Sequence, residues 1–412
     1  MHFSWRGQNP DGRRIRRYQL AASVGFLMSA SVAISYGIDL LSETPQSEFV
    51  IRSISARSVA VKGDGTDAPS VPLYRTQLLD NGGQPSVHAA TLVNLPGGDI
   101  GAFWFGGSRE GGMDVEIWFA RYDQQTGKFS PARSVMSRQL LAEQLGRYIK
   151  KLGNPAAILD ENGRVWLFFV SVSVGGWATS SINFITSDDG GKTWSSARRL
   201  VTSPFFNVST LVRNPPVLLT DGGFALPVYH ELAGKFAEIL LVAPNGEIRN
   251  KTRVTWGRDA LQPSLAAISE SRGAVFMRYA GDPPMHMQFS STRDAGRHFS
   301  RPRPLELPNA DNSVAAAALP EANGFWIVYN SSETGRSALS IAVADRDVSM
   351  IVPIHDLESA DSGEFSYPAI TTDIHGHHHV AWTDNRQSIK HLVFDDNWLT
   401  QALDASWVIL SP

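Results

Sequence analysis

The chain of 412 residues contains no cysteine, and this absence excludes several kinds of chemistry. Disulfide bonds, thiolate metal sites, cysteine nucleophiles and lipid anchors on cysteine all require a thiol. Other residues predict no metal site and no cofactor either. In the histidine-rich run 375–379, His377 and His379 share one face of a strand, but no third ligand follows nearby.

The body of the chain also lacks an excess of positive charge. The first 17 residues carry five arginines and one aspartate. The remainder therefore holds 37 − 5 = 32 basic and 40 − 1 = 39 acidic residues, a net charge of 32 − 39 = −7. Phosphate recognition needs a basic surface, so this balance predicts no binding to nucleic acid.

No charged residue occurs from Tyr18 to Ile38, directly after Arg13, Arg14, Arg16 and Arg17. A basic flank before about 20 uncharged, largely apolar residues indicates an export signal or a membrane anchor. We expect residues 1–17 to be a basic cytoplasmic region and residues 18–41 a transmembrane signal anchor. The rest would then lie outside the cytoplasm, in the periplasm or outside the cell. The alternative is secretion after cleavage near Ala33, because Ser31 and Ala33 are small.

After residue 42 we find no long amphipathic helix, only a short candidate at Ser137–Lys151. Instead, 11 Trp, 20 Phe, 35 Gly and 23 Pro favour many short strands joined by tight turns. Residues 42–83 are polar and predict a linker or stalk, and residues 84–412 a folded domain. Strand-like runs in that domain are Ala89–Val93, Ile100–Phe105, Glu116–Tyr122, Val165–Val170, Ile182–Thr186, Phe224–Tyr229, Ala274–Arg278, Trp326–Tyr329, Ser340–Ala344 and His378–Trp382.

These runs divide into six units of about 40–50 residues, a length at which repeats predict a β-propeller with four strands in each blade. The units are roughly 84–135, 148–200, 210–255, 261–305, 311–350 and 362–410. A β-sandwich or barrel with coincidental turns is the alternative.

Two units carry the turn pattern S/T-x-D-x-G-x-x-aromatic between strand-like runs. Aspartate can accept backbone N–H bonds across such a turn, glycine can take a positive φ, and the ring can tuck beneath the loop. The residues are Ser187, Asp189, Gly191 and Trp194 in one copy, and Thr292, Asp294, Gly296 and Phe299 in the other. The pattern resembles the Asp box of sialidases and related proteins. That resemblance implies a structural turn between the third and fourth strands of a blade, away from the active face.

A glycine-rich stretch, Gly106–Trp118, holds two acids, Glu110 and Asp114, between two strand-like runs. A loop of this kind can present carboxylates at the mouth of a propeller channel, so both are candidates for general acid/base groups. The alternative is a solvated turn with ordinary surface acids.

Further pieces of the chain resemble the sialidase-like BNR-repeat family over nearly all of residues 84–395. They are Val87–Leu92, Gly106–Trp118, Gly153–Pro155, Gln262–Ser264, Val328–Asn330 with Thr334–Arg336, and Glu364–Ala369. The resemblance implies a six-bladed propeller with exo-α-sialidase or related glycoside hydrolase activity.

Matched to the family's site, Arg278 and Arg336 take the places of the second and third arginines that hold a substrate carboxylate. Tyr367 takes the place of the nucleophile, and the acid/base group falls near Glu110 and Asp114. Two positions depart from the family: His88 replaces the first arginine and Gln262 replaces the glutamate that activates the tyrosine. We expect His88, Gln262 and Asn154 to contact substrate with the two arginines.

These departures leave three functions open. The first is a sialidase-like glycoside hydrolase acting on an acidic or hydroxyl-rich glycan at the cell envelope. The second is a glycan-binding or scaffold propeller without catalysis, because glutamine cannot take a proton from tyrosine. The third and weakest is a polysaccharide lyase in which Tyr367 or His88 abstracts a proton. The expected partners are a carbohydrate and, through the N-terminal segment, a membrane.

Overall fold

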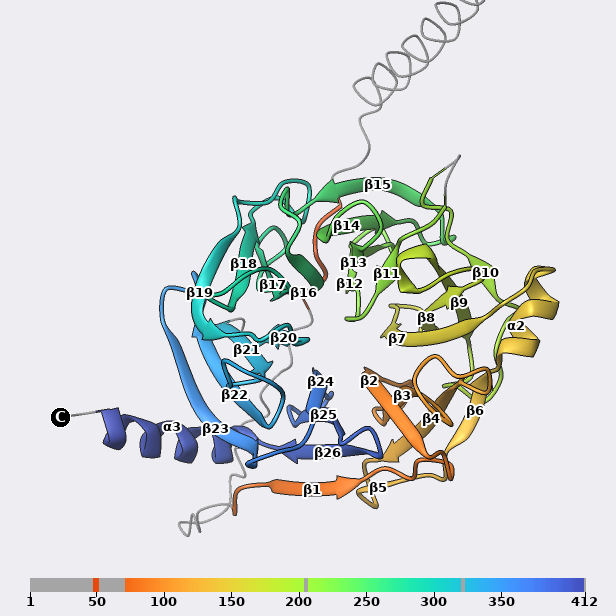
Figure 1. The fold of residues 1–412 in the computed structure, drawn as a ribbon. Helices are drawn as coiled ribbons and strands as arrows, with labels where there is room; N and C mark the ends of the chain where they lie inside the picture. The colour runs from red at the N-terminus through yellow and green to blue at the C-terminus, as the bar shows by residue number, and fades with distance from the viewer. Residues whose placement is uncertain (1–46, 52–70, 204–206, 320–322, 411–412) are drawn as a thin grey trace, which may run out of the picture. The chain divides into compact units, whose positions relative to one another are not determined.

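The computed structural model describes residues 47–51, 71–203, 207–319 and 323–410. Within these residues six antiparallel sheets form a ring around a central axis (Figure 1). The predicted all-β, six-bladed propeller is confirmed. The predicted signal anchor at residues 18–41 lies outside the described residues, and none of the described helices is long and apolar enough to cross a membrane.

Each blade begins with the strand nearest the axis and continues outward in chain order. Blade 1 consists of β2 (Ser86–Asn94), β3 (Ile100–Gly107), β4 (Glu116–Asp123), β5 (Lys128–Phe129) and β6 (Arg133–Met136). Blade 2 consists of β7 (Lys151–Leu159), β8 (Val165–Val172), β9 (Ser180–Ser187) and β10 (Arg198–Arg199), with the short helix η1 (Trp177–Thr179) before β9. Blade 3 consists of β11 (Leu211–Val212), β12 (Val217–Leu218), β13 (Phe224–His230), β14 (Phe236–Val242) and β15 (Ile248–Arg253).

The second half of the ring repeats this plan. Blade 4 consists of β16 (Ala260–Ala267), β17 (Gly273–Tyr279), β18 (His286–Thr292) and β19 (Arg303–Pro308). Blade 5 consists of β20 (Ala315–Ala318), β21 (Gly324–Tyr329), β22 (Ala338–Asp345) and β23 (Ile351–Ser359). Blade 6 consists of β24 (Phe365–Thr372), β25 (His378–Asp384), β26 (Ser388–Phe394) and an outermost strand from elsewhere in the chain, β1 (Tyr74–Leu78).

The strand β1 closes the ring, because it pairs antiparallel with β26 and joins the start of the domain to its last blade (Figure 1). Phe49 is fully buried and forms a bridge with Leu219 at blade 3. Two parts of the expected linker 42–83 therefore belong to the ring. The YRTQL sequence of β1 is mostly exposed and carries little apolar pattern, so the strand was not evident from the sequence.

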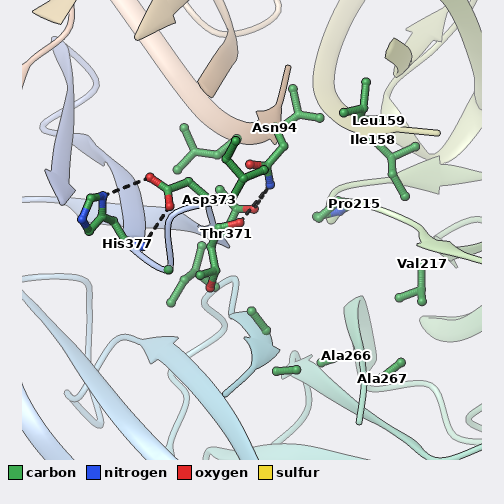
Figure 2. A pocket seen from close by; sticks show the side chains of 18 of the residues that line it. Asn94, Ile158, Leu159, Pro215, Val217, Ala266, Ala267, Thr371, Asp373 and His377 are labelled. Atoms are coloured by element: carbon green, nitrogen blue, oxygen red, sulfur yellow. Dashed lines mark hydrogen bonds and ion pairs between the residues drawn. The ribbon is translucent and has the colours of Figure 1, made fainter. Parts of the chain in front are cut away.

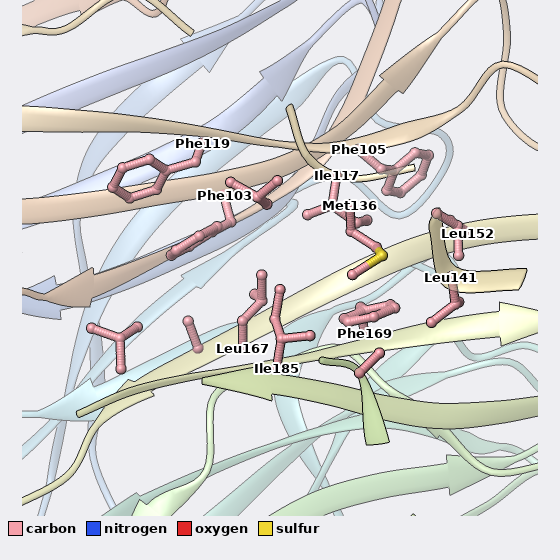
Figure 3. Packing of buried hydrophobic residues seen from close by; sticks show 14 of the residues in the cluster. Phe103, Phe105, Ile117, Phe119, Met136, Leu141, Leu152, Leu167, Phe169 and Ile185 are labelled. Atoms are coloured by element: carbon pink, nitrogen blue, oxygen red, sulfur yellow. The ribbon is translucent and has the colours of Figure 1, made fainter. Parts of the chain in front are cut away.

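The blades hold together through apolar side chains at the contacts between neighbouring sheets. Between blades 1 and 2, Phe103 and Phe105 face Leu167 and Phe169 in an apolar layer that also buries Met136 (Figure 3). Burying a side chain of this size contributes about 1.5–3 kcal/mol relative to leaving it exposed. Each pair of neighbouring blades has such a layer, so the core of the ring is divided among the contacts between blades.

Among the described residues, two α-helices lie outside the sheets. The helix α2 (Arg138–Leu145) is the short one predicted, with Ser137 as its N-cap and Gly146, at φ 60°, as its C-cap. The helix α3 (Asp396–Leu410) corrects the expectation that no long helix follows residue 42. The side chain of Asp395 accepts the amide of Trp398 and caps this helix. Trp398 packs against the core of blades 5 and 6, a contact that the helix gains only from the folded ring.

The two Asp boxes lie between the third and fourth strands of blades 2 and 4. The Asp189 carboxylate accepts the amide of Thr193 at 2.9 Å, and the Ser187 hydroxyl accepts the amide of Gly191 at 2.8 Å. Asp294 and Thr292 make the equivalent bonds in blade 4. Strand direction places both boxes at the end of the ring where the innermost strands finish.

Candidate functional site: an arginine cluster around Tyr367

The innermost strands share an irregularity close to where they begin. Four of them change register against the second strand, and the residue in the bulge has a positive φ. These residues are Ala89 (56°), Asn154 (48°), Gln262 (49°) and Tyr367 (52°). Three of the four precede a proline, and none is a glycine, although this backbone region favours glycine. Strain of this kind is common at functional sites, where it re-aims a side chain.

Tyr367 lies at the centre of a cluster drawn from several blades. Its phenolic oxygen is 3.3 Å from Nη1 of Arg278, which donates to it. The guanidinium carbon of Arg336 lies 5.5 Å from the centre of the tyrosine ring, and that of Arg213 lies 5.3 Å away. The His88 ring is tilted against the tyrosine with 4.3 Å between the ring centres. Residues predicted from distant parts of the sequence thus meet at one end of the ring.

A chain of alternating charge extends from this centre. Arg278 Nε is 2.6 Å from Asp311, and Arg336 Nη1 is 2.9 Å from Glu364. The other oxygen of Glu364 is 2.7 Å from Arg386 Nε, and Arg386 Nη1 also binds Glu110. The side chains of Arg278 and Arg336 are 13% and 21% exposed, so solvent reaches this network.

The arginines of this network lower the pKa values of its carboxylates Glu364 and Asp311. Burial alone would raise the pKa of Glu364, but the hydrogen bond and charge of Arg386 and the charge of Arg336 outweigh it, and the pKa is lowered. The pKa of Asp311 is lowered in the same way by Arg278. Glu364 and Asp311 therefore carry full negative charges near neutral pH.

Arg213 is the arginine without a carboxylate. It is buried, and its Nη2 donates to the backbone oxygens of Tyr367 at 2.7 Å and Pro368 at 3.0 Å. Its Nε and Nη1 have no partner among the described residues. Burial lowers the pKa of Arg213 to about 10, so it stays protonated at neutral pH. Because blade 3 faces blade 6 across the ring, this side chain crosses the axis.

His88 and Gln262, which depart from the family pattern, occupy the interior of the cluster. Neither ring nitrogen of His88 has a partner among the described residues. Burial, followed by the charges of Arg386, Arg336, Arg213 and Arg278, lowers the pKa of His88 well below its usual value. His88 is therefore neutral at pH 7. Gln262 accepts from Arg278 at 3.2 Å, and both Gln262 and Asn154 reach the hydroxyl of Tyr229.

The two acids of the 106–118 loop behave differently. Glu110 reaches the cluster through Arg386. The Asp114 carboxylate instead accepts the amide and the hydroxyl of Ser108, both at 2.8 Å, and these bonds lower its pKa. Asp114 closes its own loop, and the structure gives it no contact with Tyr367 or the arginines. The loop thus brings one of its two predicted acids into the cluster.

The sequence did not predict Arg213, Arg386, Asp311 or Glu364 as site residues. One signal was present for the first: Arg213-Asn214-Pro215 repeats the Asn-Pro step of Gly153-Asn154-Pro155. The Asn214 side chain donates to the backbone oxygens of Gln262 and Pro263 in the next blade. Arg386 lies in a tight hairpin with no motif around it.

A cavity of about 1250 Å³ opens at the other end of the axis (Figure 2). The later residues of the innermost strands line it, among them Asn94, Ala266 and Thr371. At its rim, Asp373 accepts from His377 at 3.2 Å (Figure 2). None of the predicted substrate-binding or catalytic residues lines this cavity.

Several solved structures share the fold of this chain at low identity. The Hadza microbial sialidase Hz136 is 18% identical with a TM-score of 0.61, over 75% of this chain and 65% of that one. The NanB sialidase from Streptococcus pneumoniae is 11% identical with a TM-score of 0.63, over 77% and 70%. A protein of unknown function from Dyadobacter fermentans is 11% identical with a TM-score of 0.64, over 79% and 100%. Identities this low show the fold alone, and this chain spans just under two thirds of the Hadza sialidase.

No curated protein matches the sequence. The model of the BNR repeat-like domain matches residues 98–380, which is more than half of the chain and covers most of the ring. The chain belongs to the BNR repeat-like domain family.

Proposed function

We propose that the arginine cluster binds the carboxylate of an acidic sugar at the end of a glycan. The observation that carries the proposal is the charge around Tyr367. Four arginines (213, 278, 336 and 386) and Lys235 face four carboxylates (110, 231, 311 and 364), a balance of 5 − 4 = +1. One negative charge on a ligand would neutralise this surplus, and a planar guanidinium suits a carboxylate in particular.

Free hydrogen-bond donors support the same proposal. Arg278 uses Nε and Nη1 within the cluster, and Arg386 uses the same two atoms. No described residue accepts from Nη2 of either side chain. Two partly exposed guanidinium groups thus keep a donor for a ligand. Two of the similar structures carry the name sialidase, which is consistent with an acidic sugar.

Hydrolysis of the bound glycan is the second candidate function. The observation that favours it is the Arg278 bond to the Tyr367 oxygen, since a cation there would stabilise a phenolate nucleophile. Glu110 would be the acid/base group. The proton acceptor that a tyrosine nucleophile needs is absent from position 262, because glutamine cannot take a proton. A lyase reaction through His88 has less support, because that ring is buried.

A glycan panel tests both candidates. Full-length protein would be titrated with sialylated, uronate-containing and neutral oligosaccharides, and both binding and product release would be followed. We expect binding of acidic glycans only, and a 10- to 150-fold weaker affinity after Arg278→Ala, which is what losing about 1.5–3 kcal/mol of charge-assisted contact gives. Equal binding of neutral glycans, or an unchanged affinity of Arg278→Ala, would contradict the proposal.

We also propose that the N-terminal segment anchors the protein with the propeller outside the cytoplasm. The support is the run of four arginines before uncharged residues 18–38. Protease added to intact cells or spheroplasts should cleave the propeller from the membrane fraction. Recovery of the intact chain in the cytoplasmic fraction would contradict this topology.

A further inference from the structure

Arg386 stands beside the position where the family pattern has an arginine and this chain has His88. Its backbone oxygen accepts the amide of Val87, the residue directly before His88, at 2.8 Å. Among the charges that act on His88, that of Arg386 is the strongest. The guanidinium group, 35% exposed, reaches the cluster through Glu364, which it shares with Arg336.

The backbone at Arg386 is costly for an arginine. It lies in the hairpin between β25 and β26, where Asn385 has φ 50° and Arg386 has φ 57°. Glycine adopts this left-handed region freely, whereas a residue with a side chain has a higher backbone energy there. Such an outlier suggests that the side chain has a function that glycine could not supply.

His88 cannot contribute the missing charge. It is buried, and its pKa lies well below the usual value, so it is neutral where the family pattern has a permanent cation. The hairpin between β25 and β26 instead places the guanidinium group of Arg386 near residue 88. Arg278, Arg336 and Arg386 are then the three partly exposed arginines in one connected network.

We propose that Arg386 is a specificity-determining residue that supplies the third cation for the ligand carboxylate, in place of residue 88. This inference rests on the proposed function and deepens it. In the free protein Glu110 and Glu364 hold the Arg386 side chain through Nη1 and Nε. The ligand carboxylate would take the remaining Nη2 together with the donors of Arg278.

The test compares Arg386→Gly with Arg386→Lys in the full-length chain. The probes are N-acetylneuraminic acid and its methyl ester, which keeps the sugar but lacks the charge, and binding is measured by calorimetry. We expect Arg386→Gly to bind the acid 10- to 150-fold more weakly and the ester unchanged. Its melting temperature should stay the same or rise, because glycine relieves the positive φ. Arg386→Lys should recover part of the affinity for the acid.

Two controls, Arg164→Ala and Arg278→Ala, distinguish failure of the proposed Arg386 role from failure of the proposed function. Arg164→Ala removes an exposed arginine that pairs with Asp188 next to an Asp box, at the far end of the ring, and should change neither affinity. If Arg278→Ala weakens binding of the acid and Arg386→Gly does not, the role of Arg386 is overturned while the proposed function stands. If the wild-type protein binds both probes equally, the proposed function fails and the role of Arg386 fails with it. If it binds neither, glucuronic acid and its methyl ester take their place, and a wild type that binds none of the four probes overturns both proposals.

A lower melting temperature of Arg386→Gly would point to a structural loss of the Glu110 and Glu364 contacts. Arg386→Gln then decides, because glutamine keeps a hydrogen-bond donor for those carboxylates and lacks the charge. A selective loss of affinity for the acid over the ester supports the inference, and an equal affinity for the acid in Arg386→Gln and wild type overturns it.

Discussion

Nη2 of Arg213, on blade 3, lies 2.7 Å from the backbone oxygen of Tyr367, on the opposite blade 6. The same nitrogen donates to Pro368, so one side chain fixes both residues of the strained bulge. The position of the tyrosine at the centre of the arginine cluster therefore depends on a residue from the far side of the ring.

Arg213→Met should lower the free energy of unfolding by about 1–3 kcal/mol. The substitution removes the donor from two backbone oxygens that have little other access to one, although removing a buried charge offsets part of the cost. Urea denaturation of the variant and the wild type measures the difference. A variant more stable than the wild type would show that burial of the charge outweighs the two bonds.

Tyr367→Phe separates binding from hydrolysis. The phenyl ring keeps its contacts with His88 and the two arginines and loses only the bond from Arg278, which lies within the protein. Affinity for an acidic glycan should therefore be nearly unchanged. Any turnover should disappear. Turnover at the wild-type rate would exclude Tyr367 as the nucleophile.

The buried histidines His379 and His391 should make the protein less stable as the pH decreases below about 6.5. A relay joins blade 6 to β1: His379 is 3.1 Å from Asp373 and 2.9 Å from His391, which is 3.4 Å from Gln77. Burial lowers the pKa of both histidines from the ordinary 6.5. The unfolded chain then binds more protons between the lowered and the ordinary pKa, so stability is full above pH 6.5 and declines as the pH falls.

His377 and Glu231 oppose this trend, since Asp373 raises the pKa of the first and burial raises the pKa of the second. They are two groups against four histidines with lowered pKa values, His379, His391, His88 and His355. Thermal unfolding between pH 5 and pH 8 measures the balance. His391→Gln removes one titrating group and should flatten the decline. A melting temperature that rises on acidification from pH 7 to pH 5 would refute this account of the relay.

Asp189→Ala should lower the melting temperature without changing glycan affinity. The carboxylate organises the Asp-box turn through Thr193, whose hydroxyl and amide also lower its pKa. The box lies at the opposite end of the ring from the arginine cluster. Asp188→Ala is the matched control: its exposed pair with Arg164 should contribute little. A loss of affinity in Asp189→Ala at unchanged stability would place the box in the binding site.

The blade plan was predictable because it follows from local sequence. Each strand-like run expected from the apolar pattern lies within a strand of the structure, including Ala89–Val93 in β2 and His378–Trp382 in β25. The six repeats and the two Asp boxes set the architecture in the same way. β1 and α3 carry weaker local signals, since one is an exposed edge strand and the other gains its core contact from the finished ring.

The predicted site residues came from family positions, and the contacts that complete the cluster come from closure of the ring. Arg213 and Tyr367 are 154 residues apart, and Glu110 and Arg386 are 276 apart. No local pattern links such pairs. For Asp114 the local pattern was misleading. Its place in the glycine-rich loop predicted an acid/base role, but its carboxylate accepts hydrogen bonds from the nearby Ser108.

An experimental structure of the protein with a bound acidic sugar would locate the ligand carboxylate. We expect the sugar carboxylate to lie beside Tyr367, with its oxygens about 2.7–2.9 Å from guanidinium nitrogens of Arg278 and at least one of Arg336 and Arg386. A sugar bound in the 1250 Å³ cavity at the other end of the axis, with the arginine cluster empty, would contradict it.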